Sequence, residues 1–270
     1  MSPNLNKSWL RRIFWRITRF LLLLYAGLAL TGWFIADHII FQPHPSSYAK
    51  LPGLFKFSAE DGTDLAGLYL PNPRAKHSVV FFHGNAEDLG DDMPWLQAMH
   101  DVGFAVLAFD YRGYGLSAGR ATEEKIYADT HALMAYARNQ LGVKSENCVI
   151  VGRSLGGGPA VELAATTKVA GLGLISAFSS AFRVSIPIKV LPFDRFDNLS
   201  RIGAVRCPVL VIQGTKDDVV PFAHGHALLA AAAEPKRAVW IEGAKHNDIF
   251  DLAGDRILRE LVSFGATLQP

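Results

Sequence analysis

Short apolar runs alternate with stretches of helical spacing through most of the chain, after one long apolar run near the amino-terminal end. Continuous runs of Val, Ile, Leu and Phe, such as VVFF, AVLAF, CVIV and VLVI, are typical of strands buried on both faces of a parallel sheet. Because helical segments separate these strands, the pattern predicts an α/β fold with a doubly wound, mostly parallel sheet.

The predicted elements can be placed by residue number. Strands are expected at Phe55–Ala59, Leu65–Leu70, Val79–His83, Ala105–Asp110, Val149–Gly152, Ala170–Ser176, Val209–Gln213 and Val239–Glu242. Helices are expected at Met93–Asp101, Thr122–Leu141, Leu155–Thr166, Ala223–Ala233 and Asp248–Phe264. About 30 residues separate the strands that end near Ser176 and begin near Val209, which is longer than the usual loop. This stretch predicts a short lid, placed at residues 179–206 and called the lid segment below.

The long apolar run is sufficient to cross a bilayer. Residues 20–36, FLLLLYAGLALTGWFIA, carry no charge, and as a helix they span roughly 25 Å. Extension to Phe41 passes the roughly 20 residues that a bilayer needs. A cleaved signal peptide has a shorter apolar core and a small-x-small site, so residues 1–41 predict a basic segment with an uncleaved transmembrane signal anchor. Residues 42–52, QPHPSSYAKLP, predict a stiff linker, and residues 53–270 the folded body.

Charge is distributed unevenly along the chain. Five basic residues precede the first acid, Asp37, and they are Lys7, Arg11, Arg12, Arg16 and Arg19. Without them, 22 basic and 25 acidic residues remain, so the body carries −3 although the whole chain carries +2. We therefore expect no nucleic-acid partner. The positive-inside rule predicts a single-pass protein with a cytoplasmic amino terminus and a periplasmic or lumenal body.

A candidate nucleophile lies in GRSLGGG, residues 152–158, between a buried strand and a helix of small residues. In G-x-S-x-G a tight strand-to-helix turn lifts the serine oxygen above the sheet, and the glycines let strand and helix approach. Ser154 also lies at a helix amino terminus, which favours a developing oxyanion. The alternative is a capping serine with packing glycines.

A serine hydroxyl is a poor nucleophile until a base takes its proton, so a histidine and a carboxylate are expected downstream. QGTKDDVVP places Asp217 and Asp218 after the strand VLVI, and GAKHND places His246 after the strand AVWIE. The order Ser, Asp, His, each near the carboxyl end of a strand, is the order of an α/β-hydrolase.

Separated motifs from about Leu54 to the end make the chain resemble the α/β-hydrolase superfamily of serine hydrolases. The motifs are HGNAEDLG, FDYRGYGLS, GRSLGGG, QGTKDDVVP and GAKHNDI. The chain most resembles the membrane-anchored branch of lipid hydrolases and protein depalmitoylases, and it is similar to serine aminopeptidase-like hydrolases. The family pattern G-x-x-D-x-x-V-P implies Asp217 as the acid, with Asp218 as the alternative. The position before Gly214, often His in relatives, is Gln213 here, a departure away from the triad.

The resemblance also implies an oxyanion hole from the backbone N–H groups of Leu155 and Asn85. His83 would shape the loop around Asn85 rather than act as a second base. We expect no metal and no cofactor, because DYRGYG does not open a helix as G-x-G-x-x-G and the acidic run at residues 87–92 has no calcium-loop spacing. That run complements the dipole of the helix that follows.

The run IPIKVLPF, residues 186–193 of the lid segment, is apolar enough to line an acyl pocket or to lie against a bilayer. It would equally serve as a cover for the sheet edge. Together with the anchor it favours a lipid, a lipidated protein or another hydrophobic ester as substrate. We therefore expect an ester or thioester hydrolase. A peptidase or amidase with the same triad and a catalytically silent binding protein are the alternatives.

Overall fold

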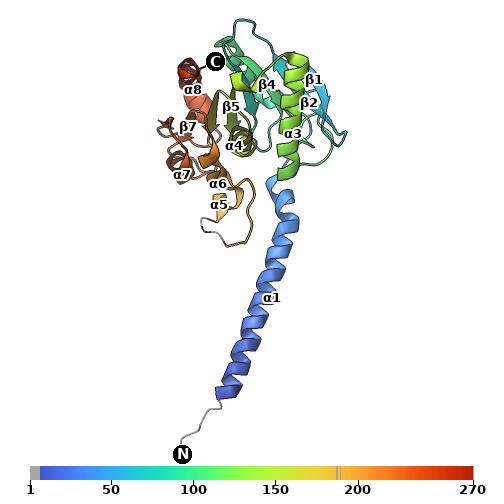
Figure 1. Ribbon diagram of the computed structural model, residues 1–270, viewed down its shortest axis with the longest axis vertical. Helices are drawn as coiled ribbons and strands as arrows, with labels where there is room; N and C mark the ends of the chain where they lie inside the picture. Colours follow the sequence, from blue (N-terminus) through green and yellow to red (C-terminus); the bar gives the residue numbers. More distant parts are fainter. Residues whose placement is uncertain (1–6, 187, 189, 270) are drawn as a thin grey trace, which may run out of the picture.

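One long helix, α1 (Lys7–Ile40), projects from an α/β body (Figure 1). The computed structural model describes residues 7–186, 188 and 190–269. The side chain of Lys7 in the basic run, and Pro187 and Lys189 in the lid segment, lie outside the described residues. Within the stretch Trp9–Ile40, an 18-residue window has a mean hydropathy of 1.7 and 11% of that window is buried, so the helix is long and apolar enough to cross a membrane.

In the described part of the chain, eight strands form one sheet in the order β1-β2-β4-β3-β5-β6-β7-β8. They are β1 (Leu54–Ser58), β2 (Asp64–Leu70), β3 (Ser78–Phe82), β4 (Ala105–Phe109), β5 (Cys148–Arg153), β6 (Gly171–Ile175), β7 (Val209–Gly214) and β8 (Lys236–Ile241). Strand β2 runs antiparallel to β1 and β4, and all pairs from β4 to β8 are parallel. The predicted mostly parallel sheet is confirmed.

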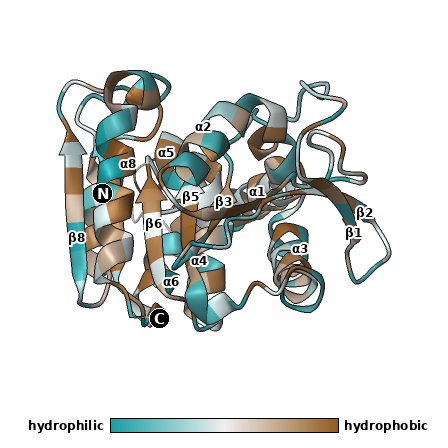
Figure 2. Ribbon diagram, turned by 90° about the horizontal axis from the view of Figure 1, so that it is seen from above, coloured by the Kyte–Doolittle hydropathy of each residue, from teal (hydrophilic) through white to brown (hydrophobic). Residues whose placement is uncertain are grey.

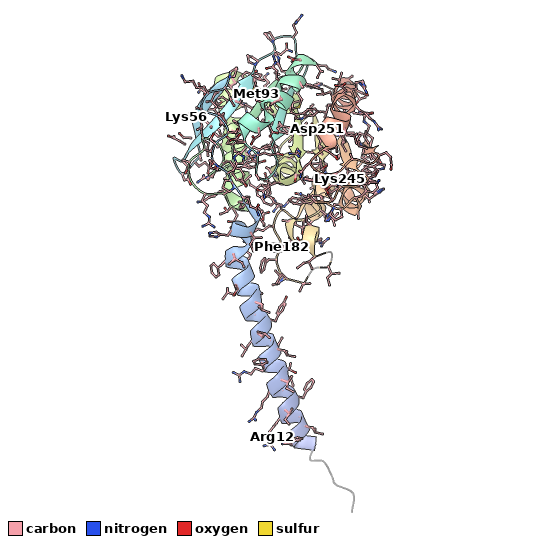
Figure 3. The ribbon with its side chains drawn as sticks, turned by 180° about the vertical axis from the view of Figure 1, so that it is seen from behind. Arg12, Lys56, Met93, Phe182, Lys245 and Asp251 are labelled. Atoms are coloured by element: carbon pink, nitrogen blue, oxygen red, sulfur yellow. The ribbon has the colours of Figure 1, made fainter. Side chains whose placement is uncertain are left out.

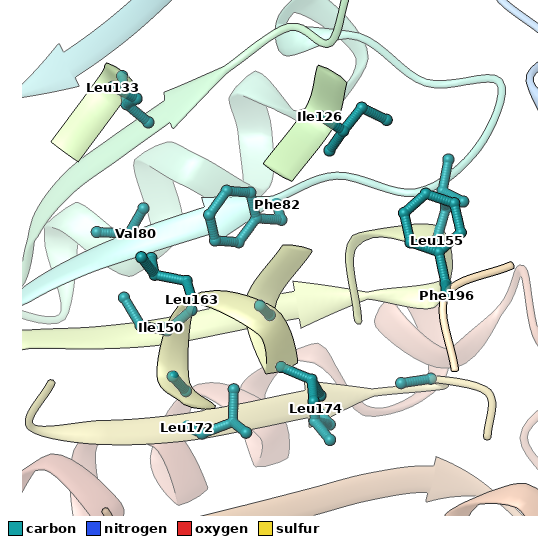
Figure 4. Close-up of a cluster of buried hydrophobic side chains, with 14 of the residues drawn as sticks. Val80, Phe82, Ile126, Leu133, Ile150, Leu155, Leu163, Leu172, Leu174 and Phe196 are labelled. Atoms are coloured by element: carbon teal, nitrogen blue, oxygen red, sulfur yellow. The ribbon is translucent and has the colours of Figure 1, made fainter. Parts of the chain in front are cut away.

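Helices cover both faces of this sheet (Figure 2). They are α2 (Leu89–Asp101), α3 (Glu123–Tyr136), α4 (Gly157–Thr166), α7 (Ala223–Ala231) and α8 (Ile249–Thr267). Successive strand residues point to opposite faces, so Val80 and Phe82 pack in one buried cluster with residues of α3 and α4 (Figure 4). Val79 and Phe81 belong to a second cluster with residues of α2 and α8. The doubly wound arrangement explains why the strands read as continuous apolar runs.

The lid segment lies at the end of the sheet from which α1 leaves (Figure 1). It contains two short helices, α5 (Ala181–Ser185) and α6 (Asn198–Arg201), followed by a turn of 3-10 helix, η4 (Ile202–Ala204). Asn198 is buried, and its side-chain Nδ2 donates to the carbonyl oxygen of Phe178, 3.0 Å away. The segment is therefore tied to the loop after β6.

Helix α2 begins four residues earlier than the apolar pattern predicts, because Asp88 caps it. The Asp88 carboxylate accepts from the backbone N–H groups of Gly90 and Asp91, at 2.9 and 3.1 Å. In the same turn Asp92 is 6% exposed, and its Oδ2 has no hydrogen-bond partner in the described part of the chain. Burial raises the pKa of Asp92 to about 8, and burial also raises the pKa of Asp110 to about 6.

The raised pKa of Asp92 predicts a pH-dependent stability. Between pH 6 and 8 the folded protein keeps the Asp92 proton and the unfolded chain has lost it. The free energy of unfolding should therefore fall by up to about 1.4 kcal/mol per pH unit on account of Asp92. In Asp92→Asn this contribution is absent. Urea unfolding should therefore show that the free energy of unfolding of the variant increases relative to that of the wild type as pH rises. Asp101→Asn, at a side chain that is 66% exposed, is the control. A constant difference between Asp92→Asn and the wild type would contradict the prediction.

Candidate active site

Ser154 sits on a sharp turn between β5 and α4, within the 3-10 turn η3 (Ser154–Gly156). Its φ is 49°, in the left-handed region that non-glycine residues rarely adopt. A Cβ at Gly152 would lie 2.4 Å from the carbonyl oxygen of Gly156, and a Cβ at Gly156 would lie 2.1 Å from that of Phe82. Both glycines are therefore required, because strand and helix approach more closely than any side chain allows.

The structure brings the three predicted triad residues together. His246 Nε2 lies 3.0 Å from Ser154 Oγ, and His246 Nδ1 lies 3.0 Å from each carboxylate oxygen of Asp217. All three are buried, with 5 to 9% of their surface exposed. They lie in the turns after β5, β7 and β8. The alternative acid, Asp218, has a side chain that is 56% exposed and lies 3.8 Å from Lys245 Nζ.

Backbone and side-chain donors hold the Asp217 carboxylate in place. The N–H groups of Val219 and Val220 donate to Oδ1, at 3.1 and 2.8 Å. Gln213 Nε2 donates to Oδ2 at 3.2 Å and to the carbonyl oxygen of Val220 at 2.7 Å. The expectation that Gln213 departs from the family pattern away from the triad was wrong, since this side chain contacts the acid. Its position at the end of the strand that precedes Asp217 was the available signal.

The loop after β3 is held by an ion pair that the sequence did not reveal. Glu87 Oε2 accepts from the N–H of Gly84 at 2.8 Å, and the same carboxylate pairs with the buried Arg153. His83 is 1% exposed, and its Nδ1 lies 2.8 Å from the carbonyl oxygen of Gly84. Burial lowers the pKa of His83 to about 4, so this imidazole is neutral at pH 7.

Asn85 links the same loop to the end of α1. Its Nδ2 donates to the carbonyl oxygen of Ile40 at 2.7 Å, and its Oδ1 accepts from the N–H of Gln42 at 3.1 Å. The hydroxyl of Tyr114 donates to the same oxygen at 2.6 Å. The side chain of Asn85 therefore joins the loop after β3 to the end of α1 and to Tyr114.

A cavity of about 440 Å³ opens at Ser154 and is lined by several separate parts of the chain. Its lining comes from Asn85 and Leu155, from Phe182 and other residues of the lid segment, from Val219 and Val220 after β7, and from the carboxyl-terminal turns of α1. Figure 3 shows Phe182 on the side of the body from which α1 leaves. The contribution of α1 was not expected from the sequence.

Near the start of α2, Asp88 and Asp91 of the acidic run lie close to His44 of the linker. The possible ligand atoms of these three side chains are within 4.8 Å of one another. The carboxylate oxygens of Asp88 accept hydrogen bonds from the backbone N–H groups of Ser47, Gly90 and Asp91. They thus satisfy N–H groups in the linker and in the first turn of the helix. The predicted dipole complementation is confirmed for Asp91, which lies in the first turn of α2, whereas Asp92 in the same turn keeps its proton at pH 7 and carries no charge.

Comparison with known proteins supports the identification of the fold. An esterase of Pyrococcus furiosus matches with a TM-score of 0.70 and 18% identity, over 83% of this chain and 98% of that one. An esterase of a Rhodococcus species matches with a TM-score of 0.62 and 22% identity, over 80% and 100%. The family described as serine aminopeptidase S33 matches residues 73–196. The chain therefore has the α/β-hydrolase fold.

The sequence relatives define the family more narrowly. The chain is 39% identical to α/β hydrolase domain-containing protein 17B of Homo sapiens over 197 residues, 71% of this chain and 68% of that protein. It is 36% identical to protein 17C of Xenopus tropicalis over 200 residues, 73% and 64%. The matched segments thus span about two thirds of these relatives. The chain belongs to the α/β hydrolase domain-containing protein 17 family.

The left-handed backbone at Ser154 predicts an unusual order of stability. Ser154→Ala keeps the strained φ, whereas Ser154→Gly removes the clash between Cβ and backbone that disfavours this region. We expect the free energy of unfolding, measured by urea denaturation, to be about 1 kcal/mol larger for the glycine variant than for the alanine variant. At Ser58, an exposed strand position, the same pair should show the opposite order. Equal stability of the two Ser154 variants would contradict the assignment of strain to this turn.

Proposed function

We propose that this protein is a membrane-anchored serine hydrolase that cleaves carboxylic ester or thioester bonds of apolar acyl substrates. The observation that carries the proposal is the relay from Ser154 Oγ to His246 Nε2 and from His246 Nδ1 to Asp217, with 3.0 Å at each step. In this arrangement an imidazole can accept the hydroxyl proton and later return it to a leaving group. Family membership supports the same class of chemistry.

The reaction proceeds in two displacements. Ser154 Oγ attacks the carbonyl carbon while its proton passes to His246 Nε2, and Asp217 stabilises the imidazolium and fixes its tautomer. The tetrahedral intermediate expels the alcohol or thiol, which takes the proton from His246, and an acyl-serine remains. Water then gives a proton to His246 and attacks the acyl carbon. Collapse of the second intermediate releases the carboxylic acid and returns the proton to Ser154.

The oxyanion of each intermediate would be bound by the backbone N–H groups of Leu155 and Asn85. Both residues line the cavity at Ser154. The hydrogen bonds of the Asn85 side chain and the pair of Glu87 with Arg153 support this role, because they hold the loop in one position. A preorganised donor costs no rearrangement as charge develops.

The lining of the cavity favours an apolar acyl chain. Most of the residues around it are aliphatic or aromatic, among them Ile35, Leu155, Phe182 and Val220. We infer that the substrate is a lipid, a lipidated protein or another hydrophobic ester.

Membrane anchoring is the second part of the proposal. The length and hydropathy of α1 support a single transmembrane span, with a basic cytoplasmic segment and anchor in residues 1–41, a linker in residues 42–52 and the hydrolase body in residues 53–270. The basic residues Arg11, Arg12, Arg16 and Arg19 precede the apolar run, so the body would lie on the periplasmic or lumenal side. Cytosolic acylated proteins would then be outside its reach.

The acid of the triad can be tested by a matched pair of variants. Asp217→Asn should lower kcat for p-nitrophenyl butyrate on the order of 10³- to 10⁴-fold, because the imidazole loses the partner that fixes its tautomer. Asp218→Asn should stay within about twofold of the wild type, since its side chain points to solvent. Losses of similar size in both variants would refute the assignment.

Labelling by a fluorophosphonate probe is the control for the nucleophile. The wild type should be labelled and Ser154→Ala should not. A wild type that takes no label, or equal labelling of Ser154→Ala, would instead favour a catalytically silent member of the fold.

The orientation can be measured with a tag at the carboxyl terminus. In bacterial spheroplasts, where added protease reaches only the periplasmic side of the inner membrane, the tag should be digested while a tag at the amino terminus is protected. A protected carboxyl-terminal tag that becomes accessible only after lysis of the inner compartment would place the body in the cytoplasm and contradict the predicted orientation.

A further inference from the structure

We propose that the carboxyl-terminal turns of α1 form one wall of the acyl-binding site, and that the acyl chain enters this site sideways from the bilayer. The chain would lie in the groove between α1 and the lid segment, with its carbonyl carbon at Ser154. This inference deepens the hydrolase function and membrane anchoring proposed above and rests on both. It makes the membrane-spanning segment a determinant of specificity as well as an anchor.

The first support is the spacing of the helix residues that line the cavity. Gly32, Ile35, Ala36 and Ile39 line the same cavity as Ser154. Positions separated by three, four and seven residues lie on one face of a helix, so α1 presents a continuous strip toward the nucleophile. Gly32 and Ala36 carry no branched bulk, so this strip leaves the wall of the cavity low at these two positions.

The second support is the rigid attachment of this strip to the body. The Asp37 carboxylate accepts from Arg195 Nε of the lid segment at 3.0 Å, and the guanidinium of Arg195 lies 4.3 Å from the ring centroid of Trp33. At the last turn of α1, Asn85 Nδ2 donates to the carbonyl oxygen of Ile40. Contacts at both levels keep the wall at a constant distance from Ser154.

The third support is the depth that the lid segment reaches along α1. The hydroxyl of Tyr25 donates to the carbonyl oxygen of Val190 at 2.9 Å, and a Cβ at Gly32 would lie 3.6 Å from Leu191 Cδ1. Tyr25 and Gly32 precede Asp37, the first charge after the apolar run, by roughly 18 and 8 Å along the helix. These contacts therefore lie at the level of the hydrocarbon.

At that depth the lid segment exposes apolar side chains. Ile186 is 47% exposed, Ile188 70% and Val190 49%, and all three line the cavity. In water such side chains would be a liability, whereas in a leaflet they contact lipid chains. The mouth of the cavity between them and α1 would thus open to acyl chains rather than to water. An acyl chain that stays among lipid chains as it enters does not pay for transfer through water.

The test uses the full-length protein in phospholipid nanodiscs and compares kcat/KM for p-nitrophenyl dodecanoate and acetate. Gly32→Trp fills the groove, and we expect it to lower the dodecanoate-to-acetate ratio at least tenfold. Gly27→Trp is the control on the same helix, because a Cβ at Gly27 would meet nothing within 4 Å. Its ratio should stay within twofold of the wild type. Equal ratios in the two variants would overturn the inference.

A second variant guards against a folding defect in the first. Ile39→Trp places bulk in the same strip at a side chain that is 62% exposed, so core packing is not disturbed. It should also lower the ratio by tenfold or more, with an unfolding midpoint equal to that of the wild type. A stable Ile39→Trp protein with an unchanged ratio would overturn the inference even if Gly32→Trp fails to fold.

Two substrates held in the nanodisc distinguish the source of the chain. A dodecanoyl glycerol ester and an S-dodecanoyl peptide share the chain and differ in the leaving group. Ile39→Trp should lower hydrolysis of both by a similar factor, and an effect on one alone would show that the strip reads the leaving group and overturn the inference. A wild type that cleaves no ester at all would refute the proposed hydrolase function, whereas an active wild type with unaltered ratios in the variants would refute only the role of α1.

Discussion

The close approach of β5 and α4 at Ser154 is the constraint on which the rest of the site depends. Any Cβ at Gly152 or Gly156 would collide with backbone atoms, and the residue between them is forced to a φ of 49°. Strand β5 can hold this turn because it is central in the sheet, paired on both sides by β3 and β6. Buried side chains on the two faces of these strands keep the turn from relaxing, and Figure 4 shows the cluster on one face.

Parallel strands then bring the remaining groups to the same edge. The turns after β7 and β8 end beside the turn after β5, so the imidazole reaches the hydroxyl and the carboxylate reaches the imidazole without long side chains. Burying Asp217 is tolerable because His246, Gln213 and two backbone N–H groups satisfy its oxygens. The same dense hydrogen bonding keeps the carboxylate from rotating away from the imidazole.

The side chain of Asn85 both completes the hydrogen bonding at the end of α1 and fixes the loop after β3. A helix ends with carbonyl groups that have no partner within the helix, and Asn85 satisfies that of Ile40 while it binds the N–H of Gln42. The same contacts fix the loop that borders the cavity at Ser154. Position of the long helix and geometry of the site are therefore coupled through a few hydrogen bonds.

Local patterns in the sequence were sufficient to predict the succession of strands and helices along the chain and the turn at Ser154. They were also sufficient to place Asp217 and His246 after their strands. Each depends on neighbours within a few positions, such as an apolar run, a glycine spacing or a strand end. The longer helix α2 and the π-helical turn after α3 at Ala137–Leu141 were not predicted, because a cap and a backbone hydrogen-bond shift leave weak signals.

Only the tertiary structure decided that Gln213 touches the acid, that Glu87 and Arg153 brace the loop after β3, and that α1 borders the cavity. These contacts join side chains whose meeting depends on how the sheet twists and how a long helix leaves the body. The lid segment and α1 meet across 165 positions of the chain. The hydrophobic pattern of one segment does not indicate which distant segment it will contact. That contact depends on how the side chains of the two segments pack together in the folded protein.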